Sequence, residues 1–286
     1  MRVAVFYPSV ETAWSITKGV CSTLHKMGHS VTDCGSDFSG RLDHDLIFVS
    51  GPEYLWKKLR EIHPQWDRLD AVKVGWLHET VEREDYDINP IAVNGKLPME
   101  EIKKFTPQLF TPAIQDQTYD AKFLPFGVDT DMFYPRDKTE YSVIYTGSVY
   151  KKRRDFLEKY PSVRTMVGYR PYDETKDYVY GIGRATAVLN LPSLSEASNT
   201  RTFETLACKT ALITPAMRYP DYLFEDGKHL LYYQGSPEEA VSKMRTEATR
   251  LAEQGYDLVT KRHSMLHRMR YILDTINARP LRFRKR

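Results

Sequence analysis

Apolar and polar positions follow two different spacings along the N-terminal part of the chain. Residues 3–7 form a short apolar run, rich in β-branched and aromatic side chains, that stops at Pro8, so we predict a buried strand there. From about residue 12 to residue 27 the apolar positions recur with helical spacing, and Gly28 marks the end of the helix. Further strands are predicted at residues 30–32, 46–50 and 72–77.

A second alternating series follows a segment that is rich in turn-forming residues. This segment, residues 123–135, contains Pro125, Gly127 and Pro135, and we interpret it as the connection between two domains. After it, strands are predicted at residues 141–146, 186–191 and 211–214, and helices at residues 151–160 and 201–208. The last predicted helix, about residues 261–277, has one apolar side made of Met265, Met269, Ile272 and Ile276.

Strands that alternate with helices through short connections predict parallel sheets with helices on both faces. The expected fold class is therefore α/β, with two doubly wound, Rossmann-like domains facing each other across a cleft. Ligands of such sheets bind beyond the carboxyl ends of the strands. Pro8–Ser9 and His78–Glu79 occupy two of these ends.

The composition is that of an ordinary globular protein. The 286 residues suffice for two domains, since domains commonly have about 100–150 residues. The net charge of +3 excludes a polycation, although basic residues gather at 151–154 and 282–286. Three cysteines without a pairing pattern, no apolar run near about 18 residues, and no signal-peptide pattern predict a cytoplasmic protein without a membrane span.

The segment from residue 191 to residue 208 carries the strongest chemical signal. A strand leads into a small polar loop and then into a helix, so backbone N–H groups near Asn199 and Arg201 and the helix dipole favour a diphosphate. Glu196 and Glu204 are suited to accept hydrogen bonds from sugar or ribose hydroxyls. The combination points to a nucleotide sugar. A purely structural helix start remains the alternative, because the dipole alone favours an early glutamate.

Residues 193–214 resemble the donor-binding signature of retaining "group 1" glycosyltransferases of the GT-B fold, in the branch related to spore-maturation glycosyltransferases. Weaker similarities occur in family order along the chain. They are residues 76–79, the interdomain residues 124–129, the glycine turn at Gly147 with the basic residues 151–154, and His263, His267 and Arg268 near the C-terminus.

The resemblance implies a role for each matching residue. Glu204 would bind the ribose hydroxyls and Glu196 the transferred sugar. Backbone amides of Ser198, Asn199 and Thr200 would bind the diphosphate beside Gly147. Arg153, with Lys152 or Lys151, would neutralise the leaving diphosphate, and His78 would face the sugar from the N-terminal domain. We thus assign Glu196, His78 and Arg153 to catalysis, and no metal or cofactor beyond a UDP-sugar donor is implied.

The resemblance also implies a domain organisation and an activity. Residues 1–125 would form the acceptor-side domain, residues 126–264 the nucleotide-sugar domain, and residues 265–286 a helix and basic tail that pack back on the first domain. The activity would be retaining transfer of a hexose, as from UDP-glucose, to a hydroxyl of a glycan or small molecule. The family's glycine-rich loop after the first strand is missing here, and Lys209 stands where a glycine is usual.

Several alternatives stay open. The tail cations Arg282, Arg284, Lys285 and Arg286 allow an acceptor that is a hydroxylated base in DNA. A non-catalytic nucleotide-sugar-binding protein and a nucleotide-sugar epimerase share the same expected shape. Asp129-Thr130-Asp131 has an Asp-x-Asp form that could bind a metal, but we interpret it as a turn. His263 and His267 have an i, i+4 spacing that could hold zinc, but we interpret them as packing residues.

Overall fold

The computed structural model describes residues 1–8, 16–82, 96–137, 143–147, 151–161, 163–166, 175–191, 198–217 and 222–277. The chain forms two compact units. Unit 1 comprises Met1–Pro125 and Met265–Arg286, and unit 2 comprises Phe126–Ser264. No helix in these described ranges has both the length and the apolar character needed to cross a membrane.

The strands of unit 1 form one sheet in the order β2-β1-β3-β4-β5-β6. Every described neighbouring pair in this sheet is parallel. The strands β1 and β3 are buried on both faces, as the continuous apolar runs predict. The bounds are β1 (Arg2–Phe6), β2 (Ser30–Gly35), β3 (Leu46–Ser50), β4 (Val72–Trp76), β5 (Gln108–Thr111) and β6 (Lys122–Phe123).

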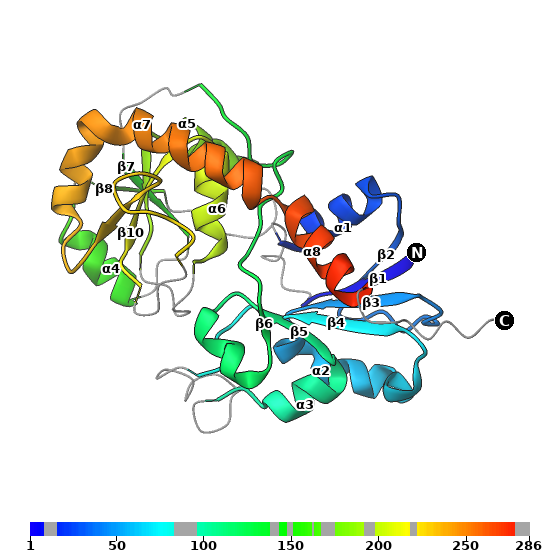
Figure 1. The fold of residues 1–286 in the computed structure, drawn as a ribbon. Coiled ribbons are helices and arrows are strands. Elements are labelled where there is room, and N and C mark those ends of the chain that lie inside the picture. The colour runs from blue at the N-terminus through cyan, green and yellow to red at the C-terminus, as the bar shows by residue number, and fades with distance from the viewer. Residues whose placement is uncertain are drawn as a thin grey trace. The chain divides into compact units, whose positions relative to one another are not determined.

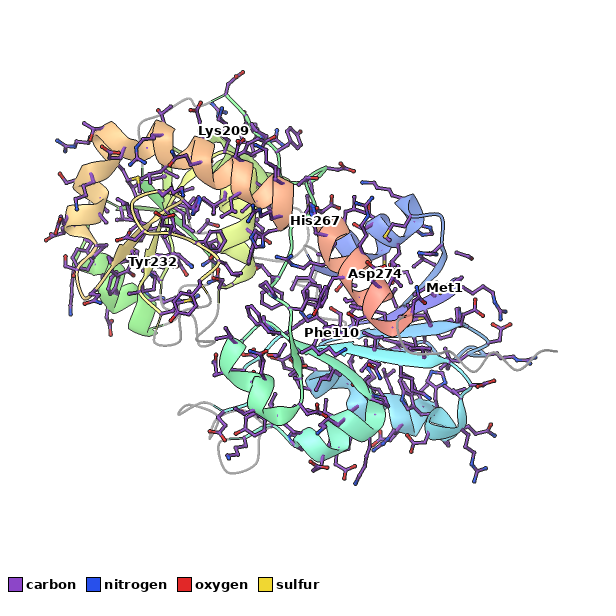
Figure 2. The ribbon with its side chains drawn as sticks, viewed as in Figure 1. Met1, Phe110, Lys209, Tyr232, His267 and Asp274 are labelled. Carbon is purple, nitrogen blue, oxygen red and sulfur yellow. The ribbon has the colours of Figure 1, made fainter. Side chains whose placement is uncertain are left out.

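Helices cover both faces of this sheet (Figure 1). On one face α1 (Ile16–Lys26) packs against α8 (Met265–Asn277), and on the other α2 (Pro52–Ile62) packs against α3 (Met99–Phe105). The predicted apolar side of the last helix is confirmed, because Met265, Met269, Ile272 and Ile276 are all buried. From β5, Phe110 reaches Tyr271 of α8 edge-on, with 6.2 Å between the ring centroids (Figure 2 labels Phe110).

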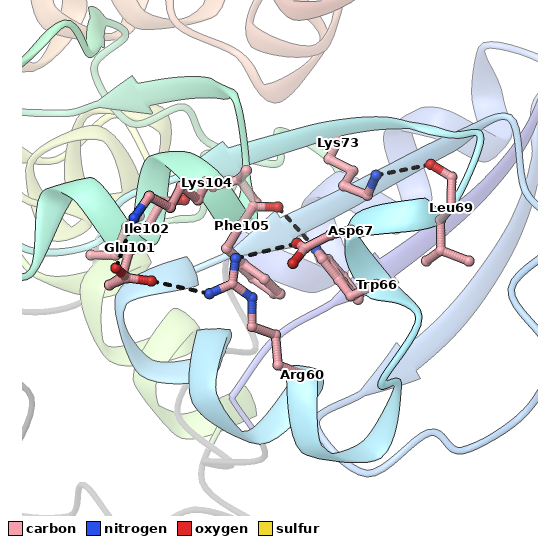
Figure 3. A network of polar contacts seen from close by, with 10 residues as sticks. Arg60, Trp66, Asp67, Leu69, Lys73, Glu101, Ile102, Lys104 and Phe105 are labelled. Carbon is pink, nitrogen blue, oxygen red and sulfur yellow. Dashed lines mark hydrogen bonds and ion pairs between the residues drawn. The ribbon is translucent and has the colours of Figure 1, made fainter.

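A network of polar contacts fastens α2 and α3 to the short 3-10 helix η1 (Trp66–Arg68) (Figure 3). Arg60 of α2 donates to Asp67 and to Glu101, each at 3.2 Å. The Trp66 indole N–H donates to the Phe105 carbonyl at 2.9 Å, and the two rings stack at 4.3 Å. Arg60, Asp67 and Glu101 therefore stabilise the packing of α2, α3 and η1.

The strands of unit 2 form a second parallel sheet, in the order β11-β10-β9-β7-β8. The long helix α7 packs on β10 and on α6. The strand bounds are β7 (Val143–Thr146), β8 (Val163–Met166), β9 (Ala187–Leu189), β10 (Ala211–Pro215) and β11 (Leu231–Tyr233). The helix bounds are α4 (Lys151–Glu158), α5 (Thr175–Arg184), α6 (Thr200–Ala207) and α7 (Glu238–Arg262).

The structure confirms the predicted α/β class with parallel sheets but corrects the last helix. We expected one helix over residues 261–277, whereas α7 ends at Arg262 and α8 begins at Met265. His263 has a non-helical φ of −127°, and its carbonyl accepts the Val128 N–H at 3.1 Å. His263 and His267 consequently belong to different segments and do not share one helical face.

Lys209, which replaces the usual glycine, follows α6 with a left-handed φ of 52°. That conformation favours glycine, so the backbone at Lys209 is strained. Its ammonium group pairs with Glu253 of α7 at 3.1 Å (Figure 2 labels Lys209).

Candidate functional site

The candidate site lies where the strand order of unit 2 reverses. The chain passes from β7 to β8 on one side and then returns to place β9 on the other side of β7. Ligands of open α/β sheets bind outside the carboxyl ends of the strands at such a switch point. Gly147 follows β7 there, and Asn190 follows β9.

Two asparagines join the end of β9 to the start of α6. Asn199 is the N-cap of α6, and its side-chain oxygen accepts the Thr202 N–H at 3.2 Å. Asn190 and Asn199 donate their amide groups to each other at 3.3 and 3.2 Å. Asn190 also donates to Thr214 Oγ1 on β10 at 3.2 Å, so the helix start is fixed against two strands.

Arg201, in the first turn of α6, approaches the glycine turn after β7. One Nη1 hydrogen bond of 3.0 Å holds it to Asn190 Oδ1, and its guanidinium lies 5.6 Å from the centre of the Tyr145 ring. Gly147 has a φ of 129°, and a Cβ atom at this position would clash with Arg201 Nη2. The glycine therefore leaves the space that the guanidinium occupies.

Arg153 reaches the same place from α4. Its Nη1 donates to the Tyr145 hydroxyl at 3.1 Å, so Tyr145 contacts one guanidinium with its hydroxyl and another with its ring. Tyr145 itself is fully buried on β7. Two cationic groups thus converge beside Gly147, at the carboxyl end of the central strand.

Glu204 is the second acidic residue of the predicted pair, and it is buried in α6. Its Oε2 accepts the hydroxyl of Tyr178, on α5, at 2.6 Å. Burial and the Glu204 carboxylate raise the pKa of the Tyr178 phenol, which therefore stays a neutral donor. Tyr178 fixes the direction of one carboxylate oxygen.

The structure describes some of the other sequence-predicted residues of this site and not the rest. Ser198 is buried, with its hydroxyl 3.8 Å from Met217 Sδ, and Thr200 is the first residue of α6. Glu196, the side chain of Lys152 and the tail cations all lie outside what the structure describes. Gly147, Arg153, Ser198, Asn199, Thr200 and Glu204 belong to unit 2.

His78 belongs to unit 1, just beyond the carboxyl end of β4. Its Nε2 lies 2.8 Å from Ser50 Oγ at the end of β3. A Cβ atom on Gly51, which has a φ of 72°, would lie 3.2 Å from His78 Nδ1. Burial lowers the pKa of His78 to about 4, so the imidazole is neutral near pH 7.

Sequence reasoning missed Arg201, Asn190 and Tyr178 as parts of this site. One signal was available for Arg201, because a cation in the first turn of a helix opposes the helix dipole and needs a reason to be there. Asn190 and Tyr178 carry no such signal. They join the site through tertiary contacts that span 9 and 26 residues of sequence.

The residues of the two rival metal sites make other contacts in the structure. Asp129 Oδ1 accepts the Asp131 N–H at 3.0 Å, as in a turn. The His263 ring packs against Phe203 and Phe224, with centroids 5.7 and 5.9 Å away. Within the described part of the chain, no group of three or more histidine, cysteine, aspartate or glutamate residues is arranged to hold a metal ion.

Part of the chain matches a known protein family. Residues 133–274 match the family described as glycosyl transferase-like. Comparison with curated protein sequences finds no match. The matched segment contains the described site residues of unit 2 and extends into α8 of unit 1.

Solved structures share the fold over nearly the whole chain. Sucrose-phosphate synthase from Thermosynechococcus elongatus is 13% identical, with a TM-score of 0.65 over 97% of this chain and 99% of that one. Anabaena HepE in complex with UDP-glucose is 11% identical, with a TM-score of 0.61 over 96% and 99%. A putative UDP-N-acetylglucosamine 2-epimerase from Listeria monocytogenes is 10% identical, with a TM-score of 0.59 over 97% and 96%. The chain has the GT-B fold, and the family match over residues 133–274 supports a transferase.

Proposed function

Starting from a glycosyltransferase of the GT-B fold, we propose that this protein transfers a hexose from a UDP-sugar to a hydroxyl of a glycan or small molecule, with retention of the anomeric configuration. The observation that carries the proposal is the convergence of Arg153 and Arg201 beside Gly147, at the start of the helix that bears Glu204. The donor would bind at this switch point.

The diphosphate of the donor fits the cationic end of this site. Guanidinium groups bind phosphate oxygens through paired N–H donors, and the N-terminus of α6 adds backbone donors and a favourable dipole. Gly147 would let the diphosphate approach the main chain closely. As the sugar–phosphate bond breaks, Arg153 and Arg201, together with Lys152, the sequence neighbour of Arg153, would stabilise the charge that develops on the leaving diphosphate.

Glu204 and Glu196 would bind the two polyol parts of the donor. An ionised carboxylate offers about four acceptor positions, so Glu204 can hold the Tyr178 hydroxyl and still accept ribose hydroxyls. Glu196 would contact the transferred hexose. His78 would contribute a neutral imidazole, which donates or accepts a hydrogen bond and adds no positive charge near the sugar.

The comparisons support this proposal against its rivals. The HepE structure contains UDP-glucose, which supports a uridine nucleotide as donor. The epimerase shares the fold only, whereas the family match over residues 133–274 favours transfer. The resemblance to the spore-maturation branch stays a prediction, supported by Arg201, Phe203 and Glu204 on α6.

The proposal predicts metal-independent binding of the nucleotide through Glu204. UDP and UDP-glucose should raise the melting temperature in the presence of a chelator, and Glu204→Ala should raise the dissociation constant for UDP at least tenfold. Loss of hydrogen bonds to a charged acceptor costs about 1.5–3 kcal/mol each, which corresponds to that factor. Calorimetric titration measures the constant, and proton NMR of the released or transferred sugar reports its anomeric configuration.

The control is Glu225→Ala, which removes an exposed glutamate of unit 2 that pairs with Lys228 at 2.8 Å. This variant should bind UDP as the wild type does. If no uridine or other nucleoside diphosphate shifts the melting temperature, the donor proposal is wrong. If Glu204→Ala melts lower yet binds UDP with unchanged affinity, Glu204 is only a structural residue of α6.

A further inference from the structure

Two buried carboxyl groups hold the segment that follows β4 and carries His78. Glu53 Oε1 accepts the backbone N–H groups of His78 and Glu79, at 2.7 and 3.0 Å. Asp116 Oδ2 accepts the backbone N–H of Val81 at 3.1 Å, in addition to the Thr111 hydroxyl at 3.0 Å. One carboxyl group therefore fixes the main chain at His78 itself, and the other fixes it three residues later.

The junction between β3 and α2 holds both the backbone and the ring of His78. Ser50, the last residue of β3, faces the imidazole Nε2, and Glu53, in the first turn of α2, binds the backbone N–H. Between them Gly51 turns the chain with its left-handed φ and leaves room for the ring. Three nearby residues of one junction thus set the position and the orientation of the imidazole.

Burying the Glu53 side chain is costly. The Glu53 side chain is completely buried, and its Oε2 makes no hydrogen bond within the described residues. Burial raises the pKa of Glu53 to about 8, which measures how unfavourable the charged form is there. Costly buried polar groups persist where they fix the geometry of a functional site.

We propose that Glu53 is a positioning residue, which acts on the transfer reaction only by holding the backbone and hence the imidazole of His78. The inference rests on the proposed function, because it takes His78 as the group that faces the donor sugar. Glu53 touches no substrate in this account. Its contribution passes through two backbone hydrogen bonds and disappears when His78 is removed.

The test is a double-mutant cycle between Glu53 and His78. Glu53→Met keeps the volume but removes the acceptor, and we expect kcat for UDP release from UDP-glucose to fall at least about tenfold, because small misplacements of a contact group cost up to about 100-fold. Glu53→Gln keeps an acceptor oxygen and should restore most of kcat. In a His78→Ala background, Glu53→Met should cause no further loss.

A second readout does not depend on the proposed function. Proton NMR titration gives the pKa of the His78 imidazole, whose signal is identified by its absence in His78→Ala. We expect a value of about 4 in the wild type and a rise toward 6.5 in Glu53→Met, because the released segment exposes the ring to water. Asp116→Leu is the matched control, since it loosens the same segment at Val81 and should leave the His78 pKa nearly unchanged.

The outcomes separate the two proposals. If the wild type neither binds nor turns over a UDP-sugar, the proposed function fails, while the NMR titration still tests whether Glu53 positions His78. Additive losses in the cycle, or an unmoved His78 pKa in Glu53→Met, would overturn the positioning role. If Glu53→Met does not fold, Glu53→Asp provides the same test, because its shorter side chain draws the carboxylate away from both N–H groups.

Discussion

At the scale of single residues, the missing side chain of Gly147 leaves the space beside the turn after β7 that the Arg201 guanidinium occupies. We expect Gly147→Ala to raise the dissociation constant for UDP at least tenfold, because the new Cβ would displace Arg201 Nη2 from its place beside the turn. Loss of one charge-assisted hydrogen bond, worth about 1.5–3 kcal/mol, has an effect of this size. Titration calorimetry with UDP measures it.

Gly227→Ala supplies the matched control for this substitution. Gly227 also belongs to unit 2 and has a left-handed φ of 69°, but nothing lies within 4 Å of its added Cβ. Both glycines have a positive φ, so both variants should melt at a lower temperature, and Gly147→Ala should melt lower because a φ of 129° lies farther from the left-handed region that alanine can adopt. Equal losses of UDP affinity in the two variants would show that strain, and not the contact with Arg201, sets the binding.

Single residues also show which parts of the candidate site could be predicted from the sequence. Gly147 and Arg153 stand close together in a strand-turn-helix pattern, and the family resemblance pointed to both of them through that local pattern. Asn190 and Tyr178 reach α6 from β9 and from α5, and no local pattern encodes those meetings. Arg201 broke a local electrostatic preference, which is the kind of conflict that sequence analysis can detect.

At the scale of elements, the start of α6 depends on one capping residue. Asn199→Ala removes the acceptor for the Thr202 N–H and the amide pair with Asn190. We expect a loss of about 0.5–2 kcal/mol in the free energy of unfolding of unit 2. Urea denaturation followed by circular dichroism measures this loss.

Asn199→Asp is the comparison variant, because aspartate keeps an N-cap acceptor and loses only the amide donor to Asn190. It should retain most of the stability that Asn199→Ala loses. A comparable loss in both variants would mean that the pair with Asn190, and not the cap, stabilises this end of the helix.

The elements also explain which parts of the fold the sequence could predict. Alternating strands and helices follow from local apolar spacing, and these gave the two parallel sheets. The break at His263 arises from its hydrogen bond with Val128, far away in the sequence, so a periodicity that continues through residues 261–277 does not reveal it. Most of α7 went unpredicted, since its buried side rests mainly on small residues such as Ala240, Ala248 and Ala252.

At the scale of the whole molecule, three buried groups of unit 1, Glu53, Asp116 and His78, have strongly displaced pKa values. The raised pKa values of Glu53 and Asp116, about 8 and about 6, reduce stability as the pH rises toward them. The pKa of His78 is lowered to about 4 from an ordinary 6.5, so its contribution increases stability as the pH rises toward 6.5. Of these three contributions, that of Glu53 changes most above pH 6.5.

We therefore expect the free energy of unfolding of unit 1 to fall between about pH 6.5 and pH 8, and Glu53→Gln to abolish most of this fall, because glutamine does not ionise. All four tryptophans, at positions 14, 56, 66 and 76, lie in the sequence of unit 1. Urea denaturation followed by tryptophan fluorescence consequently reports this unit. A stability that is constant or rising over this range in the wild type would contradict the assignment.

Unit 1 is interrupted in sequence, because residues 126–264 separate β6 from α8. Within the unit, Arg268 of α8 donates a hydrogen bond to the Pro125 carbonyl at 2.7 Å. The ribosome makes the N-terminal end first, so every strand of the first sheet leaves the ribosome long before the helix that covers one of its faces. Unit 2 meets no such delay, since Val128 and Ser264 near its two ends pair with each other. We expect the order of folding during synthesis to run against the order of the sequence, with the N-terminal unit completed last.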